Sequence, residues 1–413
     1  LIDRLLSRDA GFWEGQASGA AVLTTTYGSS PDRESILPQV AAQARQDSAG
    51  NSVVFSAMTV RMMLLAEAAF KLQRAEDGSL YGSDTSLHIL EHPWPEGSSG
   101  ELIARLEQDA GLAGNAYMWA PPGEGRLVRL RPDYVTIISE LVRVPGGGAY
   151  RRKVGYWHEP PKGVTGEGDP FEVPAAECCH FAPLPDPFAT FRGMSWLTPV
   201  HREVAGDDAM TGYKIRYLQN NASPNLLIKY AQKLAPSTVD RIRERVQARY
   251  GGPGNAGGTL VLDQGADATI IGNSLSQMSF DTVQSAGAER ILAAAGVPPL
   301  VVGLESIKGA GKSYEEVIRR FADLTLRPEW RAMCAALETV TPAIPPAVRL
   351  WVDTAAIAAL QDGQQVRAQV SLVHAQALLT LSQAGYDRDS AVKAVNSGDI
   401  TLLKPDPAAV APP

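Results

Sequence analysis

Residues 225–272 read NLLIKYAQKLAPSTVDRIRERVQARYGGPGNAGGTLVLDQGADATIIG and hold one helical pattern between strand-like runs. In PSTVDRIRERVQARY the apolar residues recur at helical spacing, and Gly251-Gly252-Pro253 follows as a stop signal. Ser237 and Asp240 form a variant of the N-terminal capping box. The runs NLLIKYA, TLVLDQG and ATIIG are short and apolar, as strands are. The stretch therefore predicts a β-α-β-β insert. The residues that share the apolar face of its helix are Val239, Ile242, Val246 and Tyr250.

Two long helical patterns flank this insert. The first covers about 24 residues, or about 36 Å at 1.5 Å per residue, and ends at Asn220-Asn221 and Pro224. The second runs from about Ser276 to Ala295 and ends at Gly296-Val297-Pro298-Pro299. We therefore predict a helix over 199–222, the insert over 223–273 and a second helix over 274–298.

The residues before these helices mix helical and strand-like patterns. Residues 1–50 are rich in Ser, Gly and Ala, which predicts an extended N-terminal arm. The segment 51–198 opens with a helix from Ser56 to Arg74 and another with Ser99 as its cap. Short β-like runs then follow from Tyr117 to Phe191 and predict an antiparallel meander.

The residues after the second long helix return to a helical pattern. A glycine- and lysine-rich loop fills 299–313, and a helix with a kink at Pro328 is expected within 314–345. The segment 346–403 contains the strand VRLWVD and two helices, at about 364–383 and 389–396, and a disordered tail follows over 404–413. The whole chain is therefore predicted to be an α+β protein.

The bulk composition narrows the class of protein. The 413 residues carry a net charge of −7, which argues against a protein that wraps nucleic acid with a basic surface. Three cysteines, two of them adjacent, cannot form a disulfide framework and favour a reducing compartment. No apolar run approaches the roughly 18 residues of a membrane helix, and the first residues lack the apolar core of a secretion signal. We therefore expect synthesis in the cytoplasm and no membrane anchor.

One motif resembles a phosphate-binding loop. SIKGAGKS (306–313) has the Gly-Lys-Ser ending of GxxxxGK[ST], but Ser306 stands where the first glycine belongs, and Pro298-Pro299 occupy the start of the strand that would feed the loop. A flexible basic loop between two helices is the favoured interpretation. The alternative is a nucleotide-binding protein with its site at Lys312 and Ser313.

In the other candidate metal sites, the side chains are not placed to meet at one metal ion. His88 and His92 have the spacing of two zinc ligands on a helix, but the prolines of HPWP prevent that helix from continuing. Cys178 and Cys179 precede His180 without a second pair at CxxC spacing, so a buried reduced pair is expected.

The adjacent Asp207 and Asp208 point about 100° apart on a helix, which favours a solvated or subunit-facing surface. The segment Gly193-Met194-Ser195-Trp196 is not a nucleophile elbow, because Leu197 replaces the second glycine. We predict no catalytic residue, no metal and no cofactor.

A row of basic residues lies on the helix of the insert. Arg241, Arg245 and Arg249 recur every four residues, opposite its apolar face. Such a row suits phosphates, an acidic partner or solvent, and the sequence leaves these three open.

The order of short motifs resembles that of the portal proteins of tailed bacteriophages, HK97-like branch. The segments that carry the resemblance are LIDRLLSR, HILEHPWP, AGNAYMWA, RLVRLRPDYVTI, CCHF, FRGMSWLTPV, LQNNASPNLLI, YGGPGNAGGTLVLDQGADATIIG, AAGVPPLVVG and LTLRPEWRAMCAALE. They cover nearly the whole chain in the family's order. The chain departs from the family in its first 50 residues and in LVVGLESIK, where the family more often has a Leu-Leu-Gly ending.

The resemblance implies a role for each segment. Residues 51–198 and 314–345 are similar to the wing, the helices 199–222 and 274–298 to the stem that lines a channel, 223–273 to the clip, 299–313 to the tunnel loop and 346–403 to the wing and crown. In that loop Lys308, Gly309, Gly311 and Lys312 are expected to face DNA. In the clip Arg241, Arg245 and Arg249 are expected to face a partner.

The resemblance also implies partners and location. The chain would form a homo-oligomeric ring, twelvefold in the family, at one capsid vertex of the virion. Its expected partners are the major capsid protein, the terminase large subunit, the head-tail connector or adaptor, and double-stranded DNA that passes through the channel during packaging and ejection. The resemblance implies no enzymatic activity, and origins in a phage or in a gene transfer agent both remain open.

Overall fold

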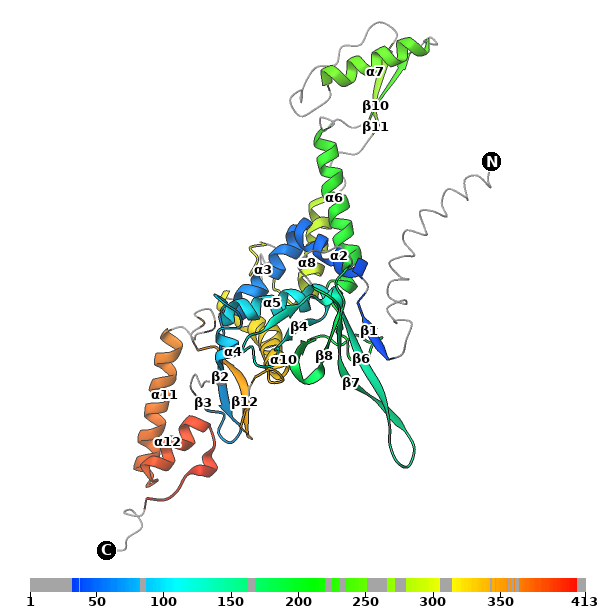
Figure 1. Cartoon of the computed structure of the whole chain (residues 1–413). Coiled ribbons are helices and arrows are strands. Elements are labelled where there is room, and N and C mark those ends of the chain that lie inside the picture. The colour runs from blue at the N-terminus through cyan, green and yellow to red at the C-terminus, as the bar shows by residue number, and fades with distance from the viewer. Residues whose placement is uncertain are drawn as a thin grey trace, which may run out of the picture. The chain divides into compact units, whose positions relative to one another are not determined.

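The computed structural model of the chain describes residues 32–36, 38–81, 87–161, 168–219, 225–230, 235–250, 266–271, 280–304, 314–341, 344–345, 347–355, 357, 360 and 364–406. The chain divides into two compact units, Leu1–Thr354 and Ala355–Pro413. Figure 1 shows their helices and strands. Together they form the mixed helical and sheet fold that the sequence predicts.

The longer helices in the described N-terminal part of the first unit are α2 (Pro38–Gly50), α3 (Ser52–Ala66) and α5 (Ser99–Ala113). The prediction of an extended arm up to residue 50 is wrong for α2, which buries Ala41, Ala44 and Asp47 on one face. Residues 1–31 of that arm lie outside the described residues. The cap of α5 is Ser98 rather than Ser99, with its hydroxyl accepting from the Glu101 N–H.

The predicted helix from Ser56 to Arg74 is also wrong in its second half. Helix α3 ends at Ala66, and Ala69–Arg74 form strand β2. Phe70 and Leu72 are buried in alternation, which is the period of a strand. Strand β2 pairs antiparallel with β12 (Val348–Asp353), the predicted VRLWVD strand, and with β3 (Leu80–Tyr81). A partner almost 280 residues away in the sequence therefore decides the structure of this segment.

The predicted meander is split between two antiparallel sheets. One has the order β1-β6-β7-β8 and the other the order β5-β4-β9. Only β6, β7 and β8 follow one another as in a meander, and β9 crosses over to pair with β4. The bounds are β1 Arg33–Ser35, β4 Ala116–Trp119, β5 Val128–Leu130, β6 Val135–Arg143, β7 Ala149–His158, β8 Phe171–Pro174 and β9 Cys178–Phe181.

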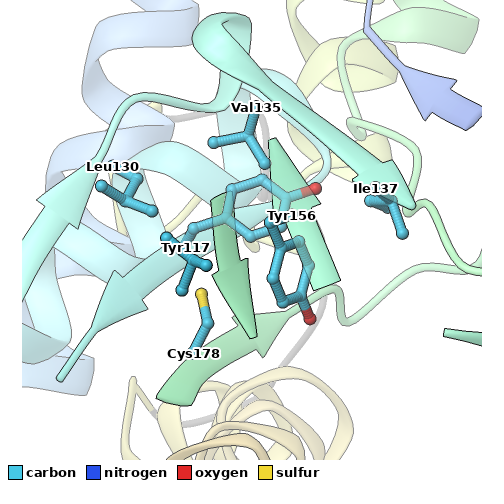
Figure 2. Packing of buried hydrophobic residues seen from close by; sticks show 7 residues of the cluster. Tyr117, Leu130, Val135, Ile137, Tyr156 and Cys178 are labelled. Atoms are coloured by element: carbon cyan, nitrogen blue, oxygen red, sulfur yellow. The ribbon is translucent and has the colours of Figure 1, made fainter. Parts of the chain in front are cut away.

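The two sheets share a buried apolar cluster (Figure 2). The rings of Tyr117 from β4 and Tyr156 from β7 meet edge to face with their centroids 5.4 Å apart. Cys178 lies in this cluster, and Cys178, Cys179 and Cys334 are buried and free, as predicted for the adjacent pair. The other members of the cluster are Leu130, Val135, Ile137 and Val173.

The insert and the long helices follow the predicted order. Helix α6 spans His201–Gln219 after a short 3-10 turn (Thr198–Val200), and α8 spans Phe280–Ala294. Between them lie β10 (Asn225–Tyr230), α7 (Pro236–Tyr250) and β11 (Ala266–Ile271), with β10 and β11 antiparallel. Helix α7 begins at Pro236, so Ser237 is already inside the helix rather than its cap. The predicted strand TLVLDQG lies outside the described residues.

The kink expected at Pro328 takes the form of a π-helical turn. Helix α9 (Tyr314–Phe321) leads into the π turn Ala322–Leu326 and then into α10 (Arg327–Leu337). Proline lacks the N–H that would bond to the carbonyl four residues earlier, and a π turn is one way to accommodate this loss.

The second unit holds α11 (Gln364–Gln383), α12 (Arg388–Ser397) and the 3-10 turn Ile400–Leu402. Helix α12 is capped by Asp387, whose carboxylate accepts from the Ser390 N–H. The tail predicted over 404–413 is ordered at its start, because Tyr386 and Pro405 form a β bridge. Residues 407–413 lie outside the described residues.

Among the described residues, no single helix combines the length and the apolar composition needed to span a membrane. Residues 40–50 and 52–66 meet these criteria only as a pair, and that pair is bent by 94°.

Candidate functional site

Helices α6 and α8 form an antiparallel pair that is held by polar side chains. Glu203 pairs with Arg290 at 3.0 Å near one end. Further along, the Gln284 amide donates to Asp207 Oδ1 at 3.0 Å, while its oxygen accepts from Lys214 Nζ at 2.6 Å. Gln284 therefore links two positions on α6 that lie two turns apart.

A second element fastens α6 to the helices before it. Asn51 accepts the N–H groups of Val53 and Val54 with its carbonyl oxygen and so caps α3. Its amide donates to Asp207 Oδ2 at 2.8 Å and to Asp208 Oδ1 at 3.0 Å. The expectation of a solvated aspartate pair is therefore wrong for Asp207, which is buried, and holds for Asp208, which is exposed.

The start of α6 is fixed by the segment Gly193–Leu197. The Ser195 hydroxyl donates to the Gly111 carbonyl at 2.6 Å and accepts from the Leu197 N–H at 3.0 Å. Ser195 is therefore a structural residue at a turn, as the missing glycine at 197 predicts. Gly114 ends α5 at φ +75°, and a Cβ on Gly193 would lie 2.1 Å from the Gly114 carbonyl oxygen. Only a residue without a side chain fits at Gly193.

Asn115 connects this turn to the β5-β4-β9 sheet. Its side chain accepts from the Gly193 N–H at 2.8 Å and donates to the Gly193 carbonyl at 3.2 Å. The Asn115 oxygen also lies 3.0 Å from His180 Nε2, and Lys153 Nζ lies 3.2 Å from His180 Nδ1. Because the lysine donates to Nδ1, Nε2 carries the proton and donates to Asn115. Burial, and next the charge of Lys153, lowers the pKa of His180 to about 3, so the ring is neutral.

The C-terminal end of α8 rests on a buried charged cluster. Arg61 of α3 donates through Nη1 to the Ala295 carbonyl and through Nε to Glu107 of α5 at 2.7 Å. Its Nη2 donates to Glu329 of α10. Arg61 is 5% exposed and Glu107 is fully buried. One guanidinium thus joins four helices and binds the carbonyl end of α8, which carries partial negative charge.

The two acids of the cluster share one counter-charge. Burial, and then the Glu107 carboxylate, raises the pKa of Glu329 above its ordinary value of 4.5, despite the lowering effect of Arg61. Burial by itself would lower the pKa of Arg61, but the two acids outweigh it and the pKa is raised. The arrangement favours a protonated Glu329 beside an Arg61–Glu107 ion pair.

The segment after α8 turns sharply toward the predicted tunnel loop. Gly296 has φ +68°, and its carbonyl accepts from the Thr325 hydroxyl at 2.9 Å. Residues 301–303 form turns, so the described residues just before SIKGAGKS contain no strand. Lys308, Gly309, Gly311 and Lys312 all lie outside the described residues, and their predicted contact with DNA stays a prediction.

The basic row of the insert lies on α7, as predicted. Arg241 is exposed, while the side chains of Arg245 and Arg249 lie outside the described residues. Their expected role toward a partner stays a prediction.

The remaining candidates form no catalytic arrangement in the described part of the chain. The rings of His88 and His92 are 5.1 Å apart, and His88 lies in the single-turn helix α4 (His88–Glu91). Within the described ranges no three His, Cys, Asp or Glu residues are placed to hold a metal ion. Burial raises the pKa of Cys178 to about 12, which disfavours the reactive thiolate.

Sequence reasoning missed the residues that anchor the helix pair. Asn51 precedes a helix as a good N-cap, so its signal was present in the sequence. Arg61 lies within an otherwise apolar helix, and a charged residue in such a position indicates a buried partner. No local signal connects Arg61 to Glu329, because the two lie 268 residues apart.

Comparisons with known proteins agree with this architecture. A family model described as phage portal protein matches residues 52–378, whereas no curated protein matches the chain. The neck of an empty gene transfer agent particle aligns with a TM-score of 0.60 and 24% identity, over 94% of this chain and 100% of that chain. The virion of a native gene transfer agent particle gives a TM-score of 0.58 and 23% identity, over 94% and 99%. An HK97-family phage portal protein from Corynebacterium diphtheriae gives 0.52 and 16%, over 77% and 97%.

The comparisons give no support to the nucleotide-binding alternative, and the resemblance found in the sequence motifs is confirmed. The family match spans helix α3, strands β2 to β9, the α6–insert–α8 unit and most of α11. The chain therefore belongs to the phage portal protein family.

Proposed function

We propose that the chain is the subunit of a closed ring at one vertex of a phage or gene transfer agent capsid, and that double-stranded DNA passes through the ring. The observation that carries this proposal is the family match, which spans the antiparallel pair α6 and α8 with its insert. A structurally similar neck, that of a native gene transfer agent particle, is described with twelvefold symmetry, and we assign twelve subunits here as well. The role is structural and requires no catalytic residue.

The charges of the long helices suit a channel in which DNA slides. Helix α6 carries three basic and three acidic residues, and α8 carries one basic and two acidic residues. Neither helix offers a continuous basic row that would hold phosphates tightly. We assign α6 and α8 to the stem that lines the channel. The loop 299–313 then supplies Lys308 and Lys312 as sparse positive charges that steer DNA without gripping it.

The segments outside the stem receive the remaining roles. The insert 223–273 is the clip, and its row Arg241, Arg245 and Arg249 faces the terminase large subunit and later the head-tail connector. Residues 51–198 and 314–345 form the wing against the major capsid protein, and 346–403 form the wing and crown. The protein is synthesised in the host cytoplasm and ends in the virion.

The assembly state of the purified chain tests the proposal most directly, because a portal subunit must close into a ring. A mass near twelve subunits with a central hole supports it. A second test is the amount of DNA packaged by particles whose loop lysines carry reversed charges.

A further inference from the structure

Strands β6 and β7 continue past every other strand of their sheet as a two-stranded ribbon, residues 139–153. Strand β1 pairs with β6 only up to Ile138, and β8 pairs with β7 only from Gly155 onward. The pairing of β6 with β7 goes on to Arg143 opposite Ala149, and the Val144 N–H then donates to the Gly148 carbonyl at 3.1 Å. Figure 1 shows this hairpin as a long projection beyond the sheet.

A two-stranded ribbon of this kind has little stability by itself. A hairpin of two strands is marginally stable in water unless a third strand or a packed surface supports it. Among the described residues no third strand pairs with the ribbon, and its tip is the glycine run Gly146–Gly148, each residue at φ near +100°. A surface supplied by another molecule would stabilise it.

The side chains of the ribbon divide between two faces with different chemistry. Residues directly opposite each other in an antiparallel pair share a face. Leu141 therefore lies beside Arg151 on one face, together with Arg143 and Lys153. The other face carries Val142 and Tyr150 beyond the exposed ion pair between Glu140 and Arg152.

Both faces expose apolar side chains close to the tip. Leu141 is 53% exposed, Val144 46% and Tyr150 51%. Three exposed apolar side chains on one short projection form an apolar surface that has no role in water. Because phosphates are bound by basic and polar groups, an apolar surface of this kind indicates a protein partner.

The charge of the ribbon is opposite to that of the rest of the chain. Its 15 residues contain four basic residues and one acidic residue, a net charge of +3, so the other 398 residues carry −10. Arg143 is exposed and makes no hydrogen bond or ion pair with the described residues, whereas Arg151 donates to Ser139. A second copy of this chain therefore presents an acidic body to a basic arm.

We propose that the ribbon 139–153 docks on the adjacent subunit of the ring and is part of the contact that closes it. The tip residues Leu141, Val144 and Tyr150 become buried there, and Arg143 meets acidic side chains of the adjacent copy. A ring is built from heterologous contacts, in which each subunit offers two different surfaces, and a projecting arm supplies one of them. This inference rests on the ring assembly proposed above.

A photo-crosslink at the tip identifies what the ribbon touches. Because all three native cysteines are buried, Val144→Cys offers one accessible thiol for a maleimide-benzophenone reagent. Irradiation of the assembled protein is expected to give covalent dimers and larger multiples of 44.1 kDa, with the crosslink mapped to another copy of the chain. The control Glu124→Cys, labelled in the exposed turn before β5, should give at least about tenfold less crosslinked dimer. Assembled rings without crosslinked multiples, or crosslinks only to added DNA, would overturn the inference.

A double variant measures the contribution of the ribbon to assembly. Arg143→Glu with Tyr150→Ser should need at least about tenfold more protein to reach half assembly, with the far-UV circular dichroism of the free subunit unchanged. The matched control is Arg126→Glu with Leu80→Ser, an exposed arginine and an exposed apolar strand residue elsewhere. It should assemble like the natural chain. If the natural chain forms rings and the ribbon variant forms them equally well, this inference fails alone. If the natural chain forms none, the ring proposal fails as well.

Discussion

The side-chain amide of Asn51 donates to Asp207 Oδ2 at 2.8 Å, while the carbonyl oxygen of the same side chain caps α3. One residue thus joins the start of α3 to the middle of α6, 156 positions later in the sequence. Just past the C-terminal end of α8, Arg61 of α3 donates to the Ala295 carbonyl. The helices that we assign to the channel are therefore both held by α3, and the stability of the subunit depends on these contacts.

The two functions of Asn51 can be separated by substitution. Asn51→Ser keeps an oxygen for the N-cap and removes the donor to Asp207, which should lower the free energy of unfolding by about 1 kcal/mol. Asn51→Asp also keeps the cap but places a third carboxylate beside Asp207 and Asp208, so we expect a loss of about 2–4 kcal/mol. Thermal and urea unfolding midpoints rank the stabilities of the natural chain and the two variants. The control is Asn396→Asp on the exposed face of α12. Equal midpoints for the Ser and Asp variants would show that the Asn51 side chain contributes only the N-cap and that its bond to Asp207 adds no stability.

The raised pKa of Glu329 gives stability a particular dependence on pH. The unfolded chain releases this proton near its ordinary pKa of 4.5, whereas the folded chain retains it to higher pH. The free energy of unfolding should therefore fall as pH rises from about 4.5 into the neutral range, by up to about 1.4 kcal/mol per pH unit. The Glu329→Gln side chain stays neutral at every pH and keeps an oxygen for Arg61. The free energy of unfolding of this variant should therefore not show the fall with rising pH that Glu329 causes. Unfolding midpoints at pH 5, 6, 7 and 8 measure it, with Glu315→Gln on α9 as an exposed control. If the unfolding midpoints of the natural chain and of Glu329→Gln changed with pH in parallel, Glu329 would not retain a proton in the folded chain.

The close approach of Gly193 and Gly114 predicts opposite effects for two glycine substitutions. Gly193→Ala places a Cβ 2.1 Å from a backbone oxygen, so the start of α6 must shift, and we expect a loss of about 3 kcal/mol or more. Gly206→Ala lies in the interior of α6 with nothing within 4 Å of the added carbon. It should raise the free energy of unfolding of the subunit by about 0.5–1 kcal/mol through helix propensity. Thermal unfolding of the two variants measures both signs. A neutral Gly193→Ala would show that the turn before α6 is not tightly packed.

The loop lysines test the passage of DNA. Particles assembled with Lys308→Glu and Lys312→Glu should package less DNA per particle, because acidic side chains in the channel repel phosphates. The control pair Lys393→Glu and Lys404→Glu applies the same charge change to exposed lysines of the C-terminal unit and should package normally. Negative-stain images must show intact rings for both pairs. Unchanged packaging by the Lys308 and Lys312 variant would remove the loop from the DNA path.

The parts of the fold that were predicted from sequence are those with strong local signals. Helix α11 and strand β12 have the predicted bounds, and the order α6, insert, α8 is also as predicted, because periodicity and terminating Gly, Pro and Asn residues lie within each segment. Strand β2 was missed, since its apolar alternation covers only a few residues and its conformation is set by pairing with β12. Helix α2 was missed because small Ala residues form its buried face and give a weak amphipathic pattern.

The anchors of the helix pair were less accessible to sequence reasoning. Asp207 was expected with Asp208 at a solvated or subunit-facing surface, because adjacent helix residues point about 100° apart. In the folded chain Asp207 is buried and accepts from Asn51, a contact that no local pattern indicates. The partners of Arg61 come from α5, α8 and α10 and meet only in the folded chain. Family resemblance identified the class of protein without these contacts, since the order of short motifs survives where individual contacts leave no pattern.

The solution mass of the purified chain by light scattering, with negative-stain images of the same sample, tests the ring assembly most directly. We predict closed rings with a central hole and a mass near that of twelve 44.1 kDa subunits, about 530 kDa. A stable monomer or dimer over the whole accessible concentration range, with no rings in the images, would contradict the central claim that this chain builds a portal.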